Sequence, residues 1–188
     1  MWVDFASEYP VKCQQIFGDN KEVVEIGSVN DRNKTVCFAG HREVYQRGVD
    51  EKVKSLILKL AQQGATIFLT GGMGEFDRMC NGAVRAVKRE FPFIRLCLII
   101  PYLTQTINEQ KDYLLESYDE LIFPDRIEGV HYKSAITLRN RWMTENSEIM
   151  LAYVGREFGG AYQMMKYAQI HGGIRIINLY KNKKADTP

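Results

Sequence analysis

The chain has 188 residues, enough for one domain with a sizeable hydrophobic core but short for two. Hydrophobic residues make up 45% of it and charged residues 26%, which excludes a wholly disordered or fibrous protein. The formal net charge is only +2, so bulk charge argues against a nucleic-acid partner and against attachment to an anionic membrane.

The ends of the chain differ in composition from its middle. Residues 1–33 are rich in acidic and turn-forming residues, and we interpret them as an extension of unknown role with a short strand over 22–26. We expect one domain over 34–181 and a short basic tail over 182–188. No apolar run approaches the roughly 18 residues that a membrane span needs, and the start lacks a basic segment leading into an apolar one. These features predict a cytoplasmic protein without a membrane partner.

The cysteines predict neither a metal site nor a redox motif. Cys13, Cys37, Cys80 and Cys97 include no C-x-x-C pair. Cys37 and Cys97 stand inside apolar runs, where cysteine behaves as a small hydrophobic residue. We therefore expect free thiols in a reducing compartment and no bound metal.

Short apolar runs alternate with stretches of helical spacing from Lys34 onward. The runs predict strands over 35–39, 65–70, 94–100, 120–123, 148–154 and 174–179. The stretches between them predict helices from Val49 to before Gly64 and over 77–90, 104–117, 133–146 and 161–171. Such alternation is typical of an α/β protein with a mostly parallel sheet of about six strands and helices on both faces. Because ligands of such sheets bind beyond the carboxyl ends of the strands, the residues after each strand are the candidates for function.

The first strand is followed by Gly40, His41 and Arg42. The glycine permits a sharp turn, and the arginine is suited to contact a phosphate or carboxylate with two hydrogen bonds. The alternative interpretation is a solvated loop that carries two basic residues.

The second strand is followed by a glycine-rich loop that leads into a helix. Gly71, Gly72 and Gly74 precede Glu75 and Asp77. Free backbone N–H groups and a helix N-terminus favour an anion there, and we assign all five residues to a ligand loop. The alternative is a tight turn in which Asp77 caps the helix.

Two more candidates follow the fourth and fifth strands. Arg139 and Asn140 share the apolar face of their predicted helix, so they must be paired or line a cavity. A structural arginine bound to a carbonyl or carboxylate is the alternative. Gly159 and Gly160 form a second glycine loop before a helix. Together, the four segments predict a crevice for a phosphate-bearing ligand, such as a nucleotide derivative.

The motifs FAGHR (38–42), TGGMGEFD (70–77), RNRWM (139–143) and GGA (159–161) resemble the YpsA-like branch of the SLOG superfamily. The resemblance covers about residues 34–180. It implies a bacterial protein with a three-layer Rossmann-like fold that binds nucleotides or nucleotide-derived ligands, with a link to cell division and stress. Relatives include the lonely-guy phosphoribohydrolases and the Rossmann domain of the DNA-processing protein that loads recombinase on single strands.

The sequence departs from the lonely-guy enzymes at the position of their catalytic glutamate. Superposing Gly160 and Ala161 on the Gly-Thr of their motif places Met164 there, and a thioether cannot act as a general acid or base. A hydrolase would therefore need Glu75, Asp77 or Glu157 as a substitute.

Three functions follow from this reading. The first is a sensor or regulator that binds a nucleotide-derived ligand, requires no cofactor and can form a homo-oligomer. The second is an N-glycosidic hydrolase of a nucleoside monophosphate. The third, single-stranded nucleic-acid binding, rests on analogy with the DNA-processing relative alone, and the weak net charge argues against it.

Overall fold

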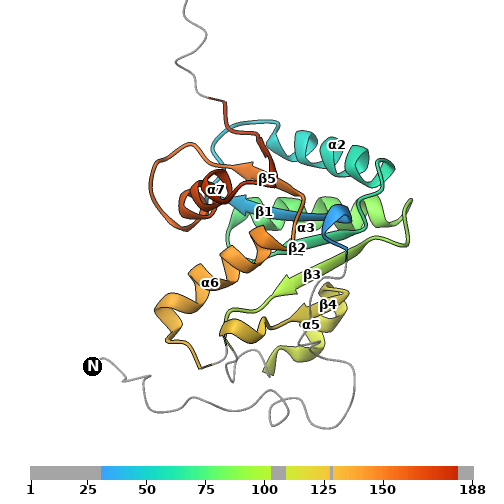
Figure 1. Cartoon of the computed structure of the whole chain (residues 1–188). Helices are drawn as coiled ribbons and strands as arrows, with labels where there is room; N and C mark the ends of the chain where they lie inside the picture. Colours follow the sequence, from blue (N-terminus) through green and yellow to red (C-terminus); the bar gives the residue numbers. More distant parts are fainter. Residues whose placement is uncertain (1–30, 103–108, 128, 182–188) are drawn as a thin grey trace, which may run out of the picture.

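Six strands form one parallel sheet. The computed structural model describes residues 31–102, 109–127 and 129–181 (Figure 1), so the strand expected over 22–26 and the basic tail lie outside the described residues. The strands are β1 (Thr35–Gly40), β2 (Ile67–Thr70), β3 (Arg95–Ile99), β4 (Glu120–Ile122), β5 (Ile149–Tyr153) and β6 (Arg175–Asn178). Every pairing is parallel, in the order β4-β3-β2-β1-β5-β6. The predicted α/β class and the six strands are confirmed.

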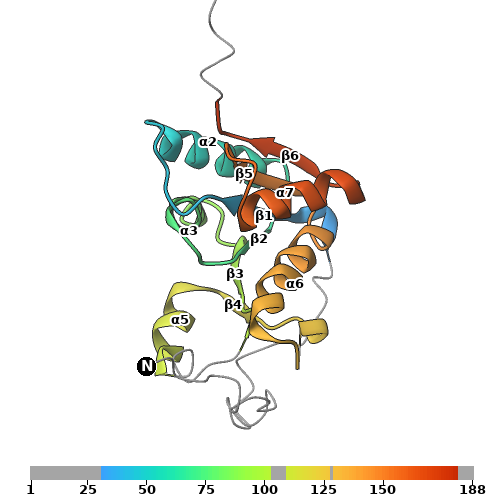
Figure 2. The ribbon, with the colours of Figure 1, turned by 90° about the vertical axis from the view of Figure 1, so that its left-hand side faces the viewer.

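Helices cover both faces of this sheet. They are α2 (Val49–Gln62), α3 (Glu75–Lys88), α5 (Lys111–Ser117), α6 (Tyr132–Glu145) and α7 (Gly160–His171), with short 3-10 turns η2 (Arg32–Lys34) and η3 (Asp125–Ile127). Figure 2 shows α2, α3 and α5 on one side of the sheet and α6 and α7 on the other. This arrangement is the expected three-layer Rossmann-like fold. Of the helix expected over 104–117, the segment 104–108 lies outside the described residues.

The central strand β1 is buried on both faces, which explains why its sequence lacks the alternation of a half-exposed strand. Val36 and Phe38 pack into the core beneath α2 and α3. Cys37 and Ala39, pointing the opposite way, pack into the core beneath α6 and α7. Because successive side chains point to opposite faces, one apolar run supplies both cores.

The strand order changes direction at β1. From β1 the chain adds β2, β3 and β4 on one side, and then crosses to add β5 and β6 on the other. A change of this kind leaves a crevice at the carboxyl ends of the two strands that flank it, here β1 and β5. At that edge Gly40 pairs with Tyr153, and the His41 N–H donates to the Tyr153 carbonyl at 3.2 Å.

Candidate functional site

A cleft of about 490 Å³ opens at this change of strand order. The loops after β1, β2 and β5 and the inward face of α6 form its walls. Most of the residues that the sequence assigns to a ligand site line it: Gly40, His41, Arg42, Gly71, Asp77, Arg139, Asn140, Gly159 and Gly160. Ile136 and Met143 also line the cleft, which confirms that Arg139 and Asn140 share the apolar face of their helix.

Gly72, Gly74 and Glu75 do not line the cleft; they shape the loops beside it. The Glu75 carboxylate accepts a hydrogen bond from the Val44 N–H at 2.7 Å, and the Glu75 N–H donates to the Arg42 carbonyl at 2.8 Å. A Cβ at Gly74, where φ is +104°, would lie 2.8 Å from the Arg42 Cα. These two residues therefore fix the β1 loop against the start of α3. A Cβ at Gly72 would meet the Leu98 side chain at 2.9 Å.

Gly40 is a glycine because of the core beneath it. A Cβ at this position would lie 2.2 Å from the Phe76 ring, which is fully buried in the first turn of α3. The close approach of β1 to α3 therefore excludes any side chain at this position.

Arg139 lies at the base of the cleft with only 3% of its surface exposed. Its Nη1 donates to the carbonyls of Gly71 at 3.0 Å and Ile99 at 3.1 Å. Its buried Nε has no hydrogen-bond partner among the described residues. Burial lowers the pKa of Arg139, but a guanidinium stays protonated in proteins. The site thus holds a fixed positive charge with one unused donor.

Asp77 shares the base of the cleft with Arg139 and is 5% exposed. Its Oδ2 accepts a hydrogen bond from the Met73 N–H at 2.8 Å. Burial raises the pKa of Asp77 to about 6, against the lowering effects of the Met73 hydrogen bond and the Arg139 charge. Asp77 does not cap α3, which has no side-chain cap; its carboxyl instead holds the loop before the helix through the Met73 N–H and also lines the cleft.

His41 positions the loop after β5. Its Nε2 accepts hydrogen bonds from the backbone N–H groups of Gly155 at 3.1 Å and Arg156 at 3.2 Å. An acceptor Nε2 requires a neutral ring with the proton on Nδ1. Burial, and then the nearby charge of Arg156, lower the pKa of His41 and keep the ring neutral.

The N-terminus of α7 also opens onto the cleft. Gly159 precedes the helix with a φ of +89°, a left-handed conformation that favours glycine, and no side chain caps the first turn. A Cβ at Gly160 would lie 3.9 Å from the Asn140 Nδ2, so the α6 amide faces the start of α7. The uncapped N–H groups and the helix dipole make this end of the cleft favourable for an anion.

Arg156, Phe158 and Met164 also line the cleft, although the sequence analysis assigned none of them to the site. Met164 is buried and contributes an apolar side chain to the cleft wall. Arg156 and Phe158 could have been predicted to line the cleft, because they belong to the same loop as Gly159 and Gly160, from which only the two glycines were assigned to the site. The cleft is lined by Arg42, Arg139 and Arg156 against the two carboxyls of Glu43 and Asp77.

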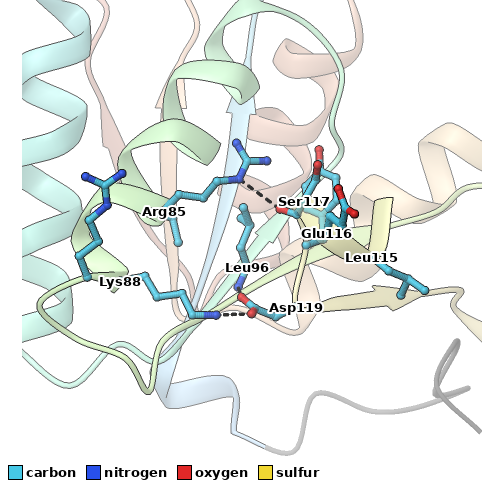
Figure 3. Close-up of a pocket in the computed structure, with 10 residues that line it drawn as sticks. Arg85, Lys88, Leu96, Leu115, Glu116, Ser117 and Asp119 are labelled. Atoms are coloured by element: carbon cyan, nitrogen blue, oxygen red, sulfur yellow. Dashed lines mark hydrogen bonds and ion pairs between the residues drawn. The ribbon is translucent and has the colours of Figure 1, made fainter. Parts of the chain in front are cut away.

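A second cavity, of about 300 Å³, lies between α3 and α5 (Figure 3). Three of its charged side chains, those of Arg85, Lys88 and Asp119, already have partners within it. The Arg85 Nε donates to the Ser117 carbonyl at 3.1 Å, and Asp119 pairs with Lys88 while accepting from the Leu96 N–H at 2.8 Å. Because these charges are satisfied internally, we place the candidate site in the cleft at the carboxyl ends.

Other kinds of site were searched for among the described residues. No group of three or more His, Cys, Asp or Glu side chains there could hold a metal ion. Cys37, Cys80 and Cys97 are buried free thiols. No helix in the described part of the chain is long and apolar enough to cross a membrane.

Comparison with known proteins identifies a distant homologue and several structural neighbours. A UPF0398 protein of Oenococcus oeni (strain ATCC BAA-331 / PSU-1) is 28% identical over 120 residues, which cover 62% of this chain and 58% of that protein. The chain thus spans less than two thirds of this relative's length. No family model matches the chain.

Two of the structural neighbours are DNA processing proteins A (DprA). The Streptococcus pneumoniae protein has a TM-score of 0.57 and 14% identity, covering 80% of this chain and 52% of its own. The Helicobacter pylori protein, whose structure was described for its single-stranded DNA binding mode, has a TM-score of 0.56 and 17% identity. The match covers 79% of this chain and 66% of that protein. The expected likeness in fold to the DNA-processing protein is therefore confirmed, while membership of the YpsA-like branch stays a prediction.

Proposed function

We propose that this protein binds a nucleotide or nucleotide-derived ligand in the cleft between β1 and β5 and acts as a sensor or regulator of the YpsA-like type. The observation that carries the proposal is the buried Arg139, whose Nε lacks a hydrogen-bond partner among the described residues, in the same cleft as the uncapped N-terminus of α7. An unpaired buried donor is costly, so a ligand that accepts its hydrogen bond would offset that cost.

The charge of the cleft supports an anionic ligand. Arg42 and Arg156 are exposed at its walls and Arg139 is buried at its base. A phosphate at the start of α7 would meet backbone N–H groups on one side and the Asn140 amide on the other. The ribose hydroxyls or further phosphates of the ligand would then extend toward the loops after β1 and β2.

The experiment that tests this proposal is a thermal-shift screen against mononucleotides, NAD, ADP-ribose and cyclic nucleotides. A ligand that binds only the folded protein adds about 2.7 kcal/mol to the free energy of unfolding at a hundred-fold excess over its Kd. We expect a raised unfolding midpoint with at least one class of nucleotide. An unchanged midpoint with every compound would contradict the proposal.

A hydrolase using this cleft would depend on Asp77. Of the three carboxyls considered as substitutes for the missing glutamate, only Asp77 lines the cleft; the Glu75 carboxylate is bonded to the Val44 N–H, and Glu157 is exposed on the loop outside. A buried carboxyl with a pKa of about 6 is suited to donate a proton near neutral pH. Release of free base from a nucleoside monophosphate, lost in Asp77→Asn, would establish this activity.

The second candidate function is binding of single-stranded nucleic acid. The expectation that a nucleic-acid partner is unlikely is weakened by the likeness in fold to two DprA proteins, one of which was studied for its single-stranded DNA binding mode. The arginines of the cleft would then contact backbone phosphates. Such binding would fall steeply with salt concentration, whereas no binding to an oligonucleotide at low salt would remove this candidate.

A further inference from the structure

Exposed apolar side chains gather at the mouth of the cleft. Phe158 is 65% exposed and Met73 is 47% exposed, and both line the cleft. They come from the loops after β5 and β2, which lie on either side of β1 in the sheet. Single exposed hydrophobic residues are common on protein surfaces, but two that face the same polar cleft call for a reason.

An arginine stands between Phe158 and a second exposed ring. The Arg156 guanidinium lies 6.0 Å from the centre of the Phe158 ring and 5.6 Å from the centre of the Tyr45 ring. Arg156 lines the cleft as well. The mouth therefore offers an aromatic face and a planar guanidinium next to each other, the two surfaces on which nucleobases stack in proteins.

Phe158 is also next in the chain to the proposed phosphate site. It directly precedes Gly159 and the uncapped start of α7. If the phosphate of a ligand binds at that helix end, the rest of the ligand would therefore lie close to the Phe158 ring. A sugar phosphate can offer only C–H groups to this aromatic face, whereas a heterocyclic base stacks on it with its whole π-face.

We infer that Phe158, with the Arg156 guanidinium beside it, is the stacking surface for the base of a nucleoside phosphate, and that the ligand is a nucleotide rather than a sugar phosphate. This inference rests on the proposed function and adds to it the residues that bind the base of the ligand. Met73 would contact the base edge from the loop after β2.

The test compares ligands with and without a base on matched variants. Calorimetric titrations would use AMP, GMP, CMP, UMP and ADP-ribose as base-containing probes and ribose 5-phosphate as the probe for the phosphate site alone. The variants are Phe158→Ala, Phe158→Trp, and Tyr45→Ala as a control. Tyr45 is equally exposed at 68% and shares Arg156 with Phe158, but it is not among the residues that line the cleft.

We expect Phe158→Ala to weaken nucleotide binding by roughly 5- to 150-fold, the loss of one base–aromatic stack, while ribose 5-phosphate binds as it does to the wild type. Phe158→Trp should restore the affinity for nucleotides, and Tyr45→Ala should leave it unchanged. Since Phe158 and Tyr45 are both exposed, the unfolding midpoints of all three variants should match that of the wild type.

Three results would overturn the inference. Unchanged nucleotide affinity in Phe158→Ala would exclude a stacking role while leaving the proposed function intact. An equal loss for ribose 5-phosphate would show that Phe158 only shapes the phosphate loop. Failure of every nucleotide to bind the wild type, including a case in which only an oligonucleotide binds, would end the proposed function and the inference together.

Discussion

The guanidinium of Arg139 packs directly against the backbone of Gly71. A Cβ at Gly71 would lie 2.6 Å from the Arg139 Nη1 and 2.9 Å from its Cζ, and the same Nη1 donates to the Gly71 carbonyl at 3.0 Å. The first glycine of the β2 loop therefore makes room for a buried arginine from α6. This contact joins α6 to the loop between β2 and α3 at the base of the cleft.

Gly71→Ala should therefore displace Arg139. We expect it to lower the free energy of unfolding by about 1–3 kcal/mol, the usual cost of forcing an extra methyl group into a packed site, and to abolish ligand binding. Gly82→Ala is the control, because Gly82 is an exposed position of α3 at which a Cβ would meet nothing within 4 Å. That change should stabilise the protein by roughly 0.5–1 kcal/mol. Urea unfolding of both variants tests the pair; equal stability of Gly71→Ala and the wild type would contradict the packing argument.

Asp77 should make the stability of the protein depend on pH. Its pKa is about 6 in the folded protein against 3.8 as the ordinary value. Because the folded state holds this proton more tightly than the unfolded chain does, the contribution of Asp77 to the free energy of unfolding falls as pH rises from about 4 to about 6, by about 3 kcal/mol in all. Asp77→Asn keeps a side-chain oxygen for the Met73 N–H and removes the titration.

Urea unfolding of the wild type and Asp77→Asn between pH 4 and pH 7 measures this contribution. The free energy of unfolding of Asp77→Asn should increase relative to that of the wild type as pH rises through the interval. Contributions from other titrating groups cancel in this comparison. Parallel stability curves would show that burial does not raise the pKa of Asp77.

His41 should control the loop after β5 as a function of pH. The pKa of His41 is lowered from 6.5 by burial and by the Arg156 charge. A protonated ring cannot accept hydrogen bonds from Gly155 and Arg156, so the stability that these bonds contribute is present above pH 6.5 and is lost as pH falls through the lowered pKa. NMR spectra should show the amide signals of these two residues shifting with a midpoint below 6.5. His171→Ala should leave that transition unchanged, and a transition that survives in His41→Ala would contradict the assignment.

The parallel sheet could be predicted because its strands are short apolar runs separated by helical patterns. β1 illustrates this: the run over 35–39 became Thr35–Gly40, with Gly40 closing the strand as expected. The position of the cleft also followed from the sequence, since it requires only that ligand loops stand at the carboxyl ends of neighbouring strands.

The separate roles of the individual residues in the glycine loops could not be predicted from the sequence. Gly71 and Gly74 are both glycines for reasons of close packing, but one packs against a cleft arginine and the other against the Arg42 backbone. His41 lines the cleft, but the two backbone hydrogen bonds that its Nε2 accepts were not expected. These roles depend on contacts between residues far apart in the chain, which spacing alone does not reveal.

The most direct test of the central claim places a negative charge at the start of α7. Gly160→Asp should repel a phosphate bound there, while an acidic residue in the first turn of a helix is neutral or favourable for folding. Gly160→Ala adds the Cβ without the charge, at a position where it meets only Asn140, at 3.9 Å. The probe is the nucleotide that raises the unfolding midpoint of the wild type most. We predict that Gly160→Ala binds this nucleotide in calorimetric titrations and that Gly160→Asp does not, although the two variants are equally stable. Binding of that nucleotide by Gly160→Asp with wild-type affinity would contradict the account.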